Sequence, residues 1–204
     1  MKLYYMPGAC SLAAHILLRE AGLPVELEKV GRDKKTEHGE NFLEVTPKGY
    51  VPALRMEDGD VLTENIVVHN YIADLRPASK LAPPHGTKAR LRQDELAVYI
   101  STEIHKTYGP MFNPALQEDA RQLQRDKLAD RYALIERLLS DGRAYLTGDH
   151  FATVDSYLFT VTRWAAGQKV DLSKFPKLLA WQKRVGERPA VKLALEAEGL
   201  ATPA

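Results

Sequence analysis

The pattern of hydrophobic and polar residues divides the chain into two parts. The first 75 residues alternate short strand-like and helix-like runs that are separated by turn signals. The predicted strands are residues 2–5, residues 25–30 and two strands within 51–64, and the predicted helices are 11–21, about 39–44 and 64–75. Asp58-Gly59 marks the turn between the last two strands, because both central positions of a type I′ turn need positive φ. This βαβαββα order predicts a small, mixed, four-stranded sheet with helices on both faces.

The remainder of the chain is helix-periodic almost throughout. Leu128, Tyr132, Ile135 and Leu139 recur at helical spacing, and a second such series starts at Val154. Between the two parts, LRPASKLAPPHGTK at 75–88 contains three prolines and a glycine, which is typical of an exposed linker. We therefore predict an α+β domain over 1–78 and an all-α domain of roughly five helices over 86–204.

Composition and charge narrow the classes of function. Lys and Arg total 28 and Asp and Glu total 27, so the basic surplus that binding to nucleic acid needs is missing. A single cysteine excludes an intramolecular disulfide and fits a reducing compartment. No run of about 18 apolar residues predicts a membrane span, and the chain opens on the strand-like KLYY rather than on a signal peptide. We expect a cytoplasmic protein with no metal site, since the histidines show no metal-ligand spacing.

The single cysteine, Cys10, lies in PGACS where a strand gives way to a helix. Unpaired N–H groups at a helix N-terminus stabilise a thiolate, so this position predicts a lowered thiol pKa, with the Ser11 hydroxyl beside the sulfur. A buried structural cysteine is the alternative. Because no second cysteine stands at position 13, dithiol exchange is excluded and the thiol needs an external partner, of which glutathione is the obvious cytosolic one.

Two further segments have features of a peptide-binding site. Val51-Pro52 begins the third strand, and a cis bond there would turn the Val51 backbone outward to pair with an extended peptide. In LTEN, residues 62–65, a helix N-terminus offers amides to a carboxylate, and Glu64 offers its charge to an ammonium group. A γ-glutamyl peptide carries both groups on one carbon. Ordinary helix capping explains the same residues equally well.

His105, in STEIHKTYGP, is a candidate donor from the second domain. On an α-helix it shares a face with Val98 and Thr102, whereas Leu96 and Ile100 point roughly the opposite way. His105 therefore need not belong to the core, although a lone histidine is more often a surface or satisfied core residue than a catalyst.

With these features placed, the chain resembles the beta class of bacterial glutathione S-transferases over essentially its whole length. The resemblance rests on MKLYYMPGACSLAAHILLREAGL, NFLEVTPKGYVPAL, LTEN, ISTEIHK, DSYLF and ERPAVKLALEAEGL. It implies a thioredoxin-like domain followed by an all-helical domain, in a homodimer. It also implies conjugation of glutathione to small hydrophobic electrophiles, with related peroxidase, dehalogenase or mixed-disulfide chemistry. A non-catalytic protein that binds glutathione or apolar ligands on the same fold is the alternative.

The resemblance also implies roles for individual residues. Cys10, Ser11 and His105 would be catalytic, with Cys10 able to form a mixed disulfide with glutathione. The implied glutathione contacts are Cys10, Lys35, Val51, Pro52, Glu64, Asn65, Thr102, Glu103 and His105. Lys35 would meet the glycine carboxylate, Val51 the tripeptide backbone ahead of a cis Pro52, and Glu64 with Asn65 the γ-glutamyl end. Thr102, Glu103 and Lys106 neighbour His105, and some of them would reach the tripeptide of the partner subunit.

The chain departs from the family pattern at several positions. Asn65 replaces a glycine or serine, and Val98 replaces a polar asparagine. Losing the polar contact at Val98 would weaken glutathione binding or its link across the dimer. Ala152 stands where a buried helix usually has a serine or threonine cap, so half of a capping box is missing. We interpret Tyr4 and Tyr5 as packing residues. Two interpretations are open for four residues of the second domain, which either line the electrophile pocket or belong to the core. These residues are Tyr108, Met111, Phe112 and Trp164.

Overall fold

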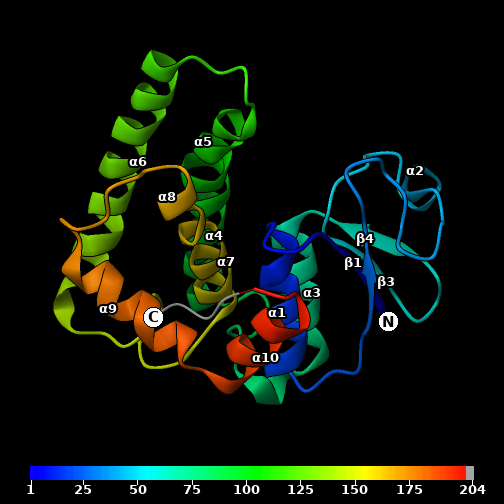
Figure 1. Cartoon of the computed structure of the whole chain (residues 1–204). Helices are drawn as coiled ribbons and strands as arrows, with labels where there is room; N and C mark the ends of the chain where they lie inside the picture. The colour runs from blue at the N-terminus through cyan, green and yellow to red at the C-terminus, as the bar shows by residue number, and fades with distance from the viewer. Residues whose placement is uncertain (201–204) are drawn as a thin grey trace.

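A four-stranded mixed sheet forms the first part of the protein (Figure 1), as seen in a computed structural model that describes residues 1–200. Residues 201–204 of the predicted second domain lie outside the described residues. The elements are β1 (Lys2–Tyr5), α1 (Ser11–Glu20), β2 (Glu26–Lys29), α2 (Phe42–Val45), β3 (Ala53–Arg55), β4 (Val61–Thr63) and α3 (Asn65–Leu75). In the strand order β2-β1-β3-β4, β1 pairs with β2 in parallel, while the β1–β3 and β3–β4 pairs are antiparallel. The predicted βαβαββα order and mixed sheet are confirmed.

The two faces of the sheet are covered differently. Helices α1 and α3 lie between the sheet and the helical part, whereas α2 lies on the far side of the sheet (Figure 1). The small cluster under α2 contains Tyr4, Val30, Phe42 and Ala53. The other face merges with the helical part into one large core, because α1 is apolar on several sides and is buried from Ser11 to Leu18. The end of β1 and the start of α1 therefore lie close to the helical part.

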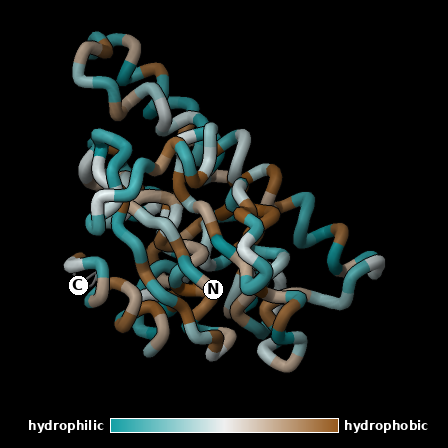
Figure 2. Tube along the Cα trace, turned by 90° about the vertical axis from the view of Figure 1, so that its right-hand side faces the viewer, coloured by the Kyte–Doolittle hydropathy of each residue, from teal (hydrophilic) through white to brown (hydrophobic). Residues whose placement is uncertain are grey.

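The second part is helical, as its periodicity predicts. Its helices are α4 (Lys88–Tyr99), α5 (Lys106–Tyr108), α6 (Glu118–Leu138), α7 (Thr153–Thr162), α8 (Trp164–Gly167), α9 (Pro176–Gly186) and α10 (Pro189–Ala197), with a π-helical segment (Ile100–His105) joining α4 to α5. All 10 residues of α7 are buried, so this helix is the centre of the bundle. Apolar segments gather in the interior and polar ones outside (Figure 2). Within residues 1–200, no helix is both long and apolar enough to cross a bilayer.

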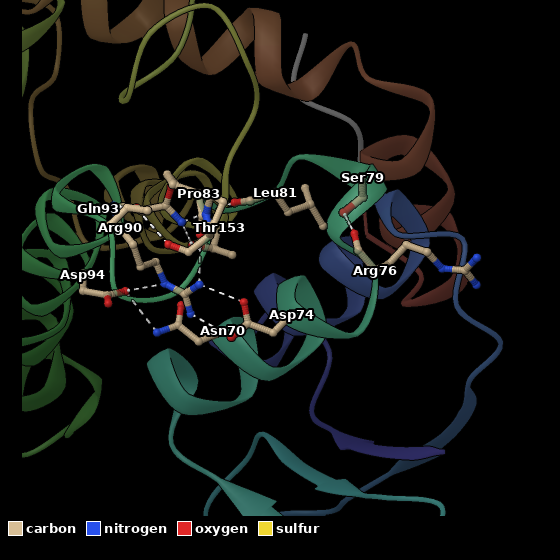
Figure 3. Close-up of polar contacts among 12 residues, drawn as sticks. Asn70, Asp74, Arg76, Ser79, Leu81, Pro83, Arg90, Gln93, Asp94 and Thr153 are labelled. Atoms are coloured by element: carbon tan, nitrogen blue, oxygen red, sulfur yellow. Dashed lines mark hydrogen bonds and ion pairs between the residues drawn. The ribbon is translucent and has the colours of Figure 1, made fainter.

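A buried arginine joins the two parts near the linker (Figure 3). Arg90 of α4 is 3% exposed and donates from both terminal nitrogens to Asp74 of α3, at 2.8 and 3.0 Å. The Arg90 guanidinium lowers the pKa of the Asp74 carboxyl. Asp94 accepts from Asn70 of α3 at 3.0 Å and from Arg90 at 3.3 Å. Such paired, bidentate contacts fix the end of α3 against α4, which helps to hold the two parts in one arrangement.

The start of α7 depends on one buried carboxylate. Asp155 Oδ2 accepts from the backbone N–H of Ala152 at 2.9 Å, while Oδ1 accepts from the N–H of Leu146 at 2.9 Å and from Trp181 Nε1 at 2.8 Å. Ala152, at the N-cap position, has extended backbone angles and no side-chain acceptor to return the bond. The predicted backward bond of Asp155 is confirmed, and it is the half of the capping box that this sequence retains.

Ala152→Thr is expected to raise the melting temperature by a few degrees. A threonine hydroxyl would accept a hydrogen bond at the start of α7, and an N-cap of this kind stabilises by about 0.5 to 2 kcal/mol relative to alanine. Ala152 borders a surface groove, which leaves room for the larger side chain. Ala152→Val is the matched control, because valine has the same shape without the hydroxyl. Calorimetry in which threonine gave no rise, or no more than valine, would refute the capping argument.

Candidate active site

A cavity of about 470 Å³ lies where the start of α1, the Val51-Pro52 bond, the start of α3 and the π-helical segment meet. Among its lining residues are the predicted Cys10, Val51, Pro52, Glu64, Asn65 and His105. The Val51-Pro52 peptide bond is cis. Ligand cavities of small molecules are typically about 300 to 1,000 Å³, so this one has room for a short peptide. Segments that are distant in sequence thus combine in one site.

The Cys10 thiol faces the cis-proline segment. Cys10 directly precedes α1 and is partly buried, and its Sγ donates to the carbonyl oxygen of Val51 at 3.2 Å. Burial raises the pKa of the thiol, while the Asn65 side chain and the backbone N–H groups of Cys10 and Ser11 partly oppose that rise. The predicted lowering of the pKa by the helix N-terminus is therefore wrong, because desolvation of the thiolate outweighs the amides. Cys10 is a neutral thiol at pH 7.

Alkylation of Cys10 tests whether the pKa of the thiol is raised rather than lowered. With a raised pKa, the thiolate fraction at pH 7 is small, so iodoacetamide should react more slowly with the protein than with free glutathione. The rate constant should rise about tenfold per pH unit and continue to rise beyond pH of about 8.5, the ordinary thiol pKa. Because Cys10 is the only cysteine, intact mass reports this thiol alone. A rate that levels off below that pH would mean that the thiolate is stabilised after all.

The Ser11 hydroxyl bonds to the turn before α1 rather than to the Cys10 sulfur. It is buried, accepts from the Met6 N–H at 3.2 Å and donates to the Met6 carbonyl oxygen at 3.3 Å. Only the backbone N–H of Ser11 acts on the thiol. The hydroxyl bridges the turn that presents Cys10, because a small polar side chain at a helix start readily bonds nearby backbone groups.

The same turn is held from the C-terminal end of the chain, which the sequence pattern did not reveal. Gly8 has a positive φ of 70°, a conformation that glycine adopts without strain. Its N–H donates to Glu198 Oε2 at 2.9 Å, and its carbonyl accepts from Trp164 Nε1 at 2.8 Å. Glu198 Oε1 lies 2.9 Å from Nδ1 of the buried His15. The helical part therefore fixes the backbone two residues before the thiol.

The π-helical segment changes which residues face the cavity. An α-helix would place Val98, Thr102 and His105 on one face, but in the wider π-helix residues four apart come nearly into line and residues three apart diverge. Ser101 and His105 accordingly line the cavity, while Val98 is 50% exposed and Thr102 is also exposed. The prediction of a shared face for Val98, Thr102 and His105 is wrong for this reason.

Thr102 and Glu103 lie outside the cavity of their own chain. Thr102 Oγ1 donates to the Val98 carbonyl oxygen at 3.0 Å, and Glu103 pairs with Arg131 of α6 at 3.0 Å. Their predicted contact with glutathione would therefore have to be made across a dimer. Lys106, which follows His105, does line the cavity.

His105 is held as a neutral imidazole. Its Nδ1 lies 2.7 Å from the Tyr157 hydroxyl, and its ring packs against Trp164 with centroids 5.1 Å apart. Burial, and secondly the charge of Lys106, lowers the pKa of His105 from 6.5 to about 4. At neutral pH the ring has one N–H and no net charge, so it can donate a hydrogen bond to an anion without titrating.

Glu64 and Asn65 line the edge of the cavity at the start of α3. Glu64 has a positive φ of 73°, and its Oε1 accepts from Lys48 Nζ at 2.8 Å. A non-glycine residue in this region is strained, and such strain is concentrated at functional sites. Asn65 is 9% exposed, and its Oδ1 has no hydrogen-bond partner among the described residues. A buried, unsatisfied oxygen next to a cavity is an acceptor available to a ligand.

The structure does not bring Lys35 to the cavity lining. Lys35 is exposed in the loop between β2 and α2, and its backbone bridges to Asn41. The neighbouring Lys34 is anchored to the Gly49 carbonyl oxygen at 2.8 Å. The lysines that line the cavity are Lys48 and Lys106. Lys48 was not predicted, and Lys106 was predicted only as one of the neighbours of His105 of which some would reach the partner subunit's tripeptide. The role of Lys35 at the glycine carboxylate stays a prediction.

The remaining aromatic candidates divide between core and surface. Tyr4 is fully buried and donates to Glu40 at 3.1 Å, and Tyr5 is 7% exposed within the main core, which confirms both as packing residues. Tyr108 and Met111 are likewise buried core residues. Phe112 is 53% exposed and packs edge-on to Trp164, whose ring in turn contacts His105. Of these four candidates, Phe112 and Trp164 are therefore the ones that are at least partly exposed, although neither lines the 470 Å³ cavity.

Two other features lie away from this site. A larger groove of about 1310 Å³ runs between α4, α6 and the linker, and its lining includes none of the predicted site residues. Glu28, Glu37 and His38 form the one group with metal-ligand chemistry among residues 1–200. However, His38 Nδ1 already lies 2.8 Å from Glu28, and Glu37 accepts from the Lys29 N–H. Neither feature contributes to the chemistry at Cys10.

Comparison with known proteins agrees with this arrangement. The glutathione S-transferase N-terminal domain family matches residues 8–75, and the C-terminal domain family matches 99–189. Glutathione S-transferase GstA of Escherichia coli O157:H7 is 41% identical over 201 residues, which cover 98% of this chain and all of the relative. The chain belongs to the glutathione S-transferase family.

Solved members of the family have the same fold. A glutathione transferase of Methylococcus capsulatus is 52% identical, with a TM-score of 0.96 over 98% of this chain and 99% of that one. A sphingomonad glutathione S-transferase complexed with glutathione is 42% identical, with a TM-score of 0.94 over 98% and 100% of the two chains. A bacterial beta class enzyme of Sphingomonas chungbukensis is 39% identical, also at a TM-score of 0.94 over 98% and 100%. The sheet and helical part described above are those of this family.

Proposed function

We propose that the protein is a beta-class glutathione transferase that binds glutathione in the 470 Å³ cavity and conjugates it to small apolar electrophiles. The observation that carries the proposal is the convergence of the lone thiol, the cis Val51-Pro52 bond and a neutral His105 on one cavity. The similarity to a sphingomonad transferase solved with glutathione supports the choice of ligand.

The residues around the cavity suit each part of the tripeptide. The Val51 backbone would pair with the central cysteinyl residue as an added strand does, after the Cys10 thiol releases the Val51 carbonyl. The Glu64 carboxylate would bind the ammonium group of the γ-glutamyl residue, and the α3 amides with Lys48 its carboxylate. The sulfur would then lie between Cys10 and His105.

Conjugation needs the glutathione thiolate at neutral pH. A neutral Cys10 S–H and the His105 N–H are uncharged donors that would stabilise the developing anion in a partly desolvated cavity. The thiolate sulfur then attacks the electrophilic carbon, forms the S–C bond and expels the leaving group. The electrophile would lie against Phe112 and Trp164. Because its own pKa is raised, Cys10 would act in conjugation as a donor rather than as the nucleophile.

Glu64→Gln tests the glutathione site. The neutral amide cannot hold the γ-glutamyl ammonium, so KM for glutathione should rise roughly tenfold or more, the effect of one charge-assisted hydrogen bond. Glu57→Gln, an exposed change in the β3–β4 turn, is the matched control. Steady-state conjugation of chlorodinitrobenzene gives KM, and calorimetric titration gives Kd. Binding of glutathione without turnover of any electrophile would instead mean that the protein is a carrier, and an equal KM in both variants would remove Glu64 from the site.

The proposal includes a homodimer formed by the exposed face of α3 and α4. Val67, Leu91 and Val98 are 48%, 65% and 50% exposed and flank the Asn70–Asp94 contact between these helices. Thr102 and Glu103 continue this face toward a partner's cavity. Since exposed apolar side chains grouped in this way mark interfaces, Leu91→Glu should give monomers in light scattering. Leu123→Glu, at a comparably exposed leucine on α6, should not; dimers that persist in Leu91→Glu would place the interface elsewhere.

A further inference from the structure

The hydroxyl of Tyr157 lies beneath the cavity and connects residues from several elements. Tyr157 belongs to the buried helix α7, is 1% exposed and does not line the cavity. Its oxygen is 2.7 Å from His105 Nδ1, and the two rings meet edge-on with centroids 5.7 Å apart at 88°. Its ring also packs edge-on against His69, with centroids 5.2 Å apart. The phenol is therefore fixed in place and cannot turn away from His105.

The hydrogen bond between Tyr157 and His105 runs in one direction, which the single hydrogen of the phenol determines. A phenol has one hydrogen to donate and otherwise only accepts. Burial keeps the phenol protonated by raising its pKa, while the Ser101 and Asn65 side chains act in the opposite sense. The short contact of the phenol oxygen is the one with His105 Nδ1, at 2.7 Å. A buried hydroxyl hydrogen needs an acceptor, and His105 Nδ1 lies within hydrogen-bond distance of the Tyr157 oxygen to accept it. A neutral imidazole that accepts at Nδ1 has its own hydrogen on Nε2.

The Asn65 side chain lowers the pKa of both the Cys10 thiol and the Tyr157 phenol, against the effect of burial. Its Oδ1 has no hydrogen-bond partner among the described residues, so this oxygen does not take the Tyr157 hydrogen.

We propose that Tyr157 is a positioning residue that holds His105 in the Nε2–H tautomer, so that the ring presents an N–H rather than a lone pair to the glutathione sulfur. The inference rests on the proposed function for the identity of that sulfur. In the opposite tautomer, the Nε2 lone pair would face a thiolate and repel it. Tyr157 touches no substrate and acts only through His105.

The tautomer can be read in the free protein by long-range ¹⁵N–¹H correlation spectra of histidine-labelled samples, with His105 assigned by His105→Gln. In the wild type at neutral pH, His105 should show a protonated Nε2 and an unprotonated Nδ1. Tyr157→Phe removes only the hydroxyl and should shift His105 to a mixture of tautomers or to Nδ1–H. Tyr132→Phe is the matched control, because it removes an equally buried hydroxyl that bonds to Tyr108 at 3.0 Å, and it should leave the His105 pattern unchanged.

Activity gives the second measurement. Tyr157→Phe should lower kcat for conjugation about tenfold, as loss of one hydrogen bond would, with KM for glutathione little changed. A wild-type His105 protonated on Nδ1, or an unchanged tautomer in Tyr157→Phe, overturns the inference, and the wild-type spectrum decides even if the variant does not fold. The tautomer is read without glutathione, so it does not depend on the proposed function. If the tautomer shifts and conjugation does not slow, the role of His105 in the proposed function is wrong instead.

Discussion

Asp155→Ala is expected to lower the melting temperature by roughly 6 to 12 °C. The change removes the acceptor of three buried donors, the N–H groups of Leu146 and Ala152 and the indole N–H of Trp181. At the low end of the cost of an unsatisfied buried donor, about 1 kcal/mol each, the three donors together cost about 3 kcal/mol, and a protein of this size loses about 2 to 4 °C per kcal/mol. Asp171→Ala is the matched control, because Asp171 accepts one exposed backbone bond from Ser173. Equal losses in both variants would contradict the central role of Asp155 in α7.

The pH dependence of Asp155 has the opposite sign from that of a surface carboxylate. Burial raises its pKa from 3.8 to about 6, with hydrogen bonds from Leu146, Trp181 and Ala152 opposing the rise. Between these values the unfolded chain releases a proton that the folded chain keeps, so stability from this group falls as pH rises. Asp155→Asn does not titrate. The stability advantage of the wild type over Asp155→Asn should therefore shrink between pH 3.8 and about 6 in urea titrations; a widening gap would reverse the assignment.

His105→Ala is expected to lower kcat/KM for conjugation roughly 10- to 100-fold. A hydrogen bond to a charged group contributes about 1.5 to 3 kcal/mol, and each 1.36 kcal/mol corresponds to about tenfold. His105→Gln, which keeps an N–H donor on a side chain of similar reach, should recover part of the loss. His85→Ala, at an exposed histidine in the linker, should have no effect. A loss no larger than that of His85→Ala would show that His105 makes no bond to the reacting sulfur.

The pH profile separates this role from a titrating base. Because the pKa of His105 is lowered to about 4, the ring stays neutral through the usual titration range of histidine near 6.5. The wild type should show no loss of activity from this group until the pH falls toward about 4. An inflection near 6.5 that disappears in His105→Gln would mean that the ring is protonated in the ordinary range.

The sequence was sufficient to predict the elements and much of the site. Periodicity predicted the strands and the helical second part, because these depend on local alternation. The chain does turn at Asp58-Gly59, but the predicted type I′ geometry is wrong, since Gly59 has a positive φ and Asp58 does not. Cys10, Val51 and Glu64 were placed at element boundaries that the fold brings together. The family resemblance connected these positions to glutathione.

Tertiary effects account for the rest. The pKa of Cys10 follows burial by residues far away in sequence, which outweighs the local helix N-terminus. Because residues 100–105 form a π-helix, Ser101 rather than Thr102 lines the cavity. No residue pattern in the sequence predicts this π-helix. Tyr157 acts on the site from α7 and Glu198 from the residue that follows α10, and both helices have sequences like those of ordinary core helices. Tyr157 belongs to the DSYLF motif, but only the fold shows that its hydroxyl lies within hydrogen-bond distance of His105.

The most direct test of the site is the rate at which Cys10 forms a mixed disulfide with glutathione disulfide, measured by intact mass at a pH of about 9, near the ordinary thiol pKa. In this step the Cys10 thiolate attacks one sulfur of the disulfide, and one glutathione leaves as its thiolate. We predict that glutathione disulfide reacts faster than the smaller hydroxyethyl disulfide, and that Glu64→Gln removes the preference. Equal rates for both disulfides in the wild type would contradict a glutathione site at Cys10.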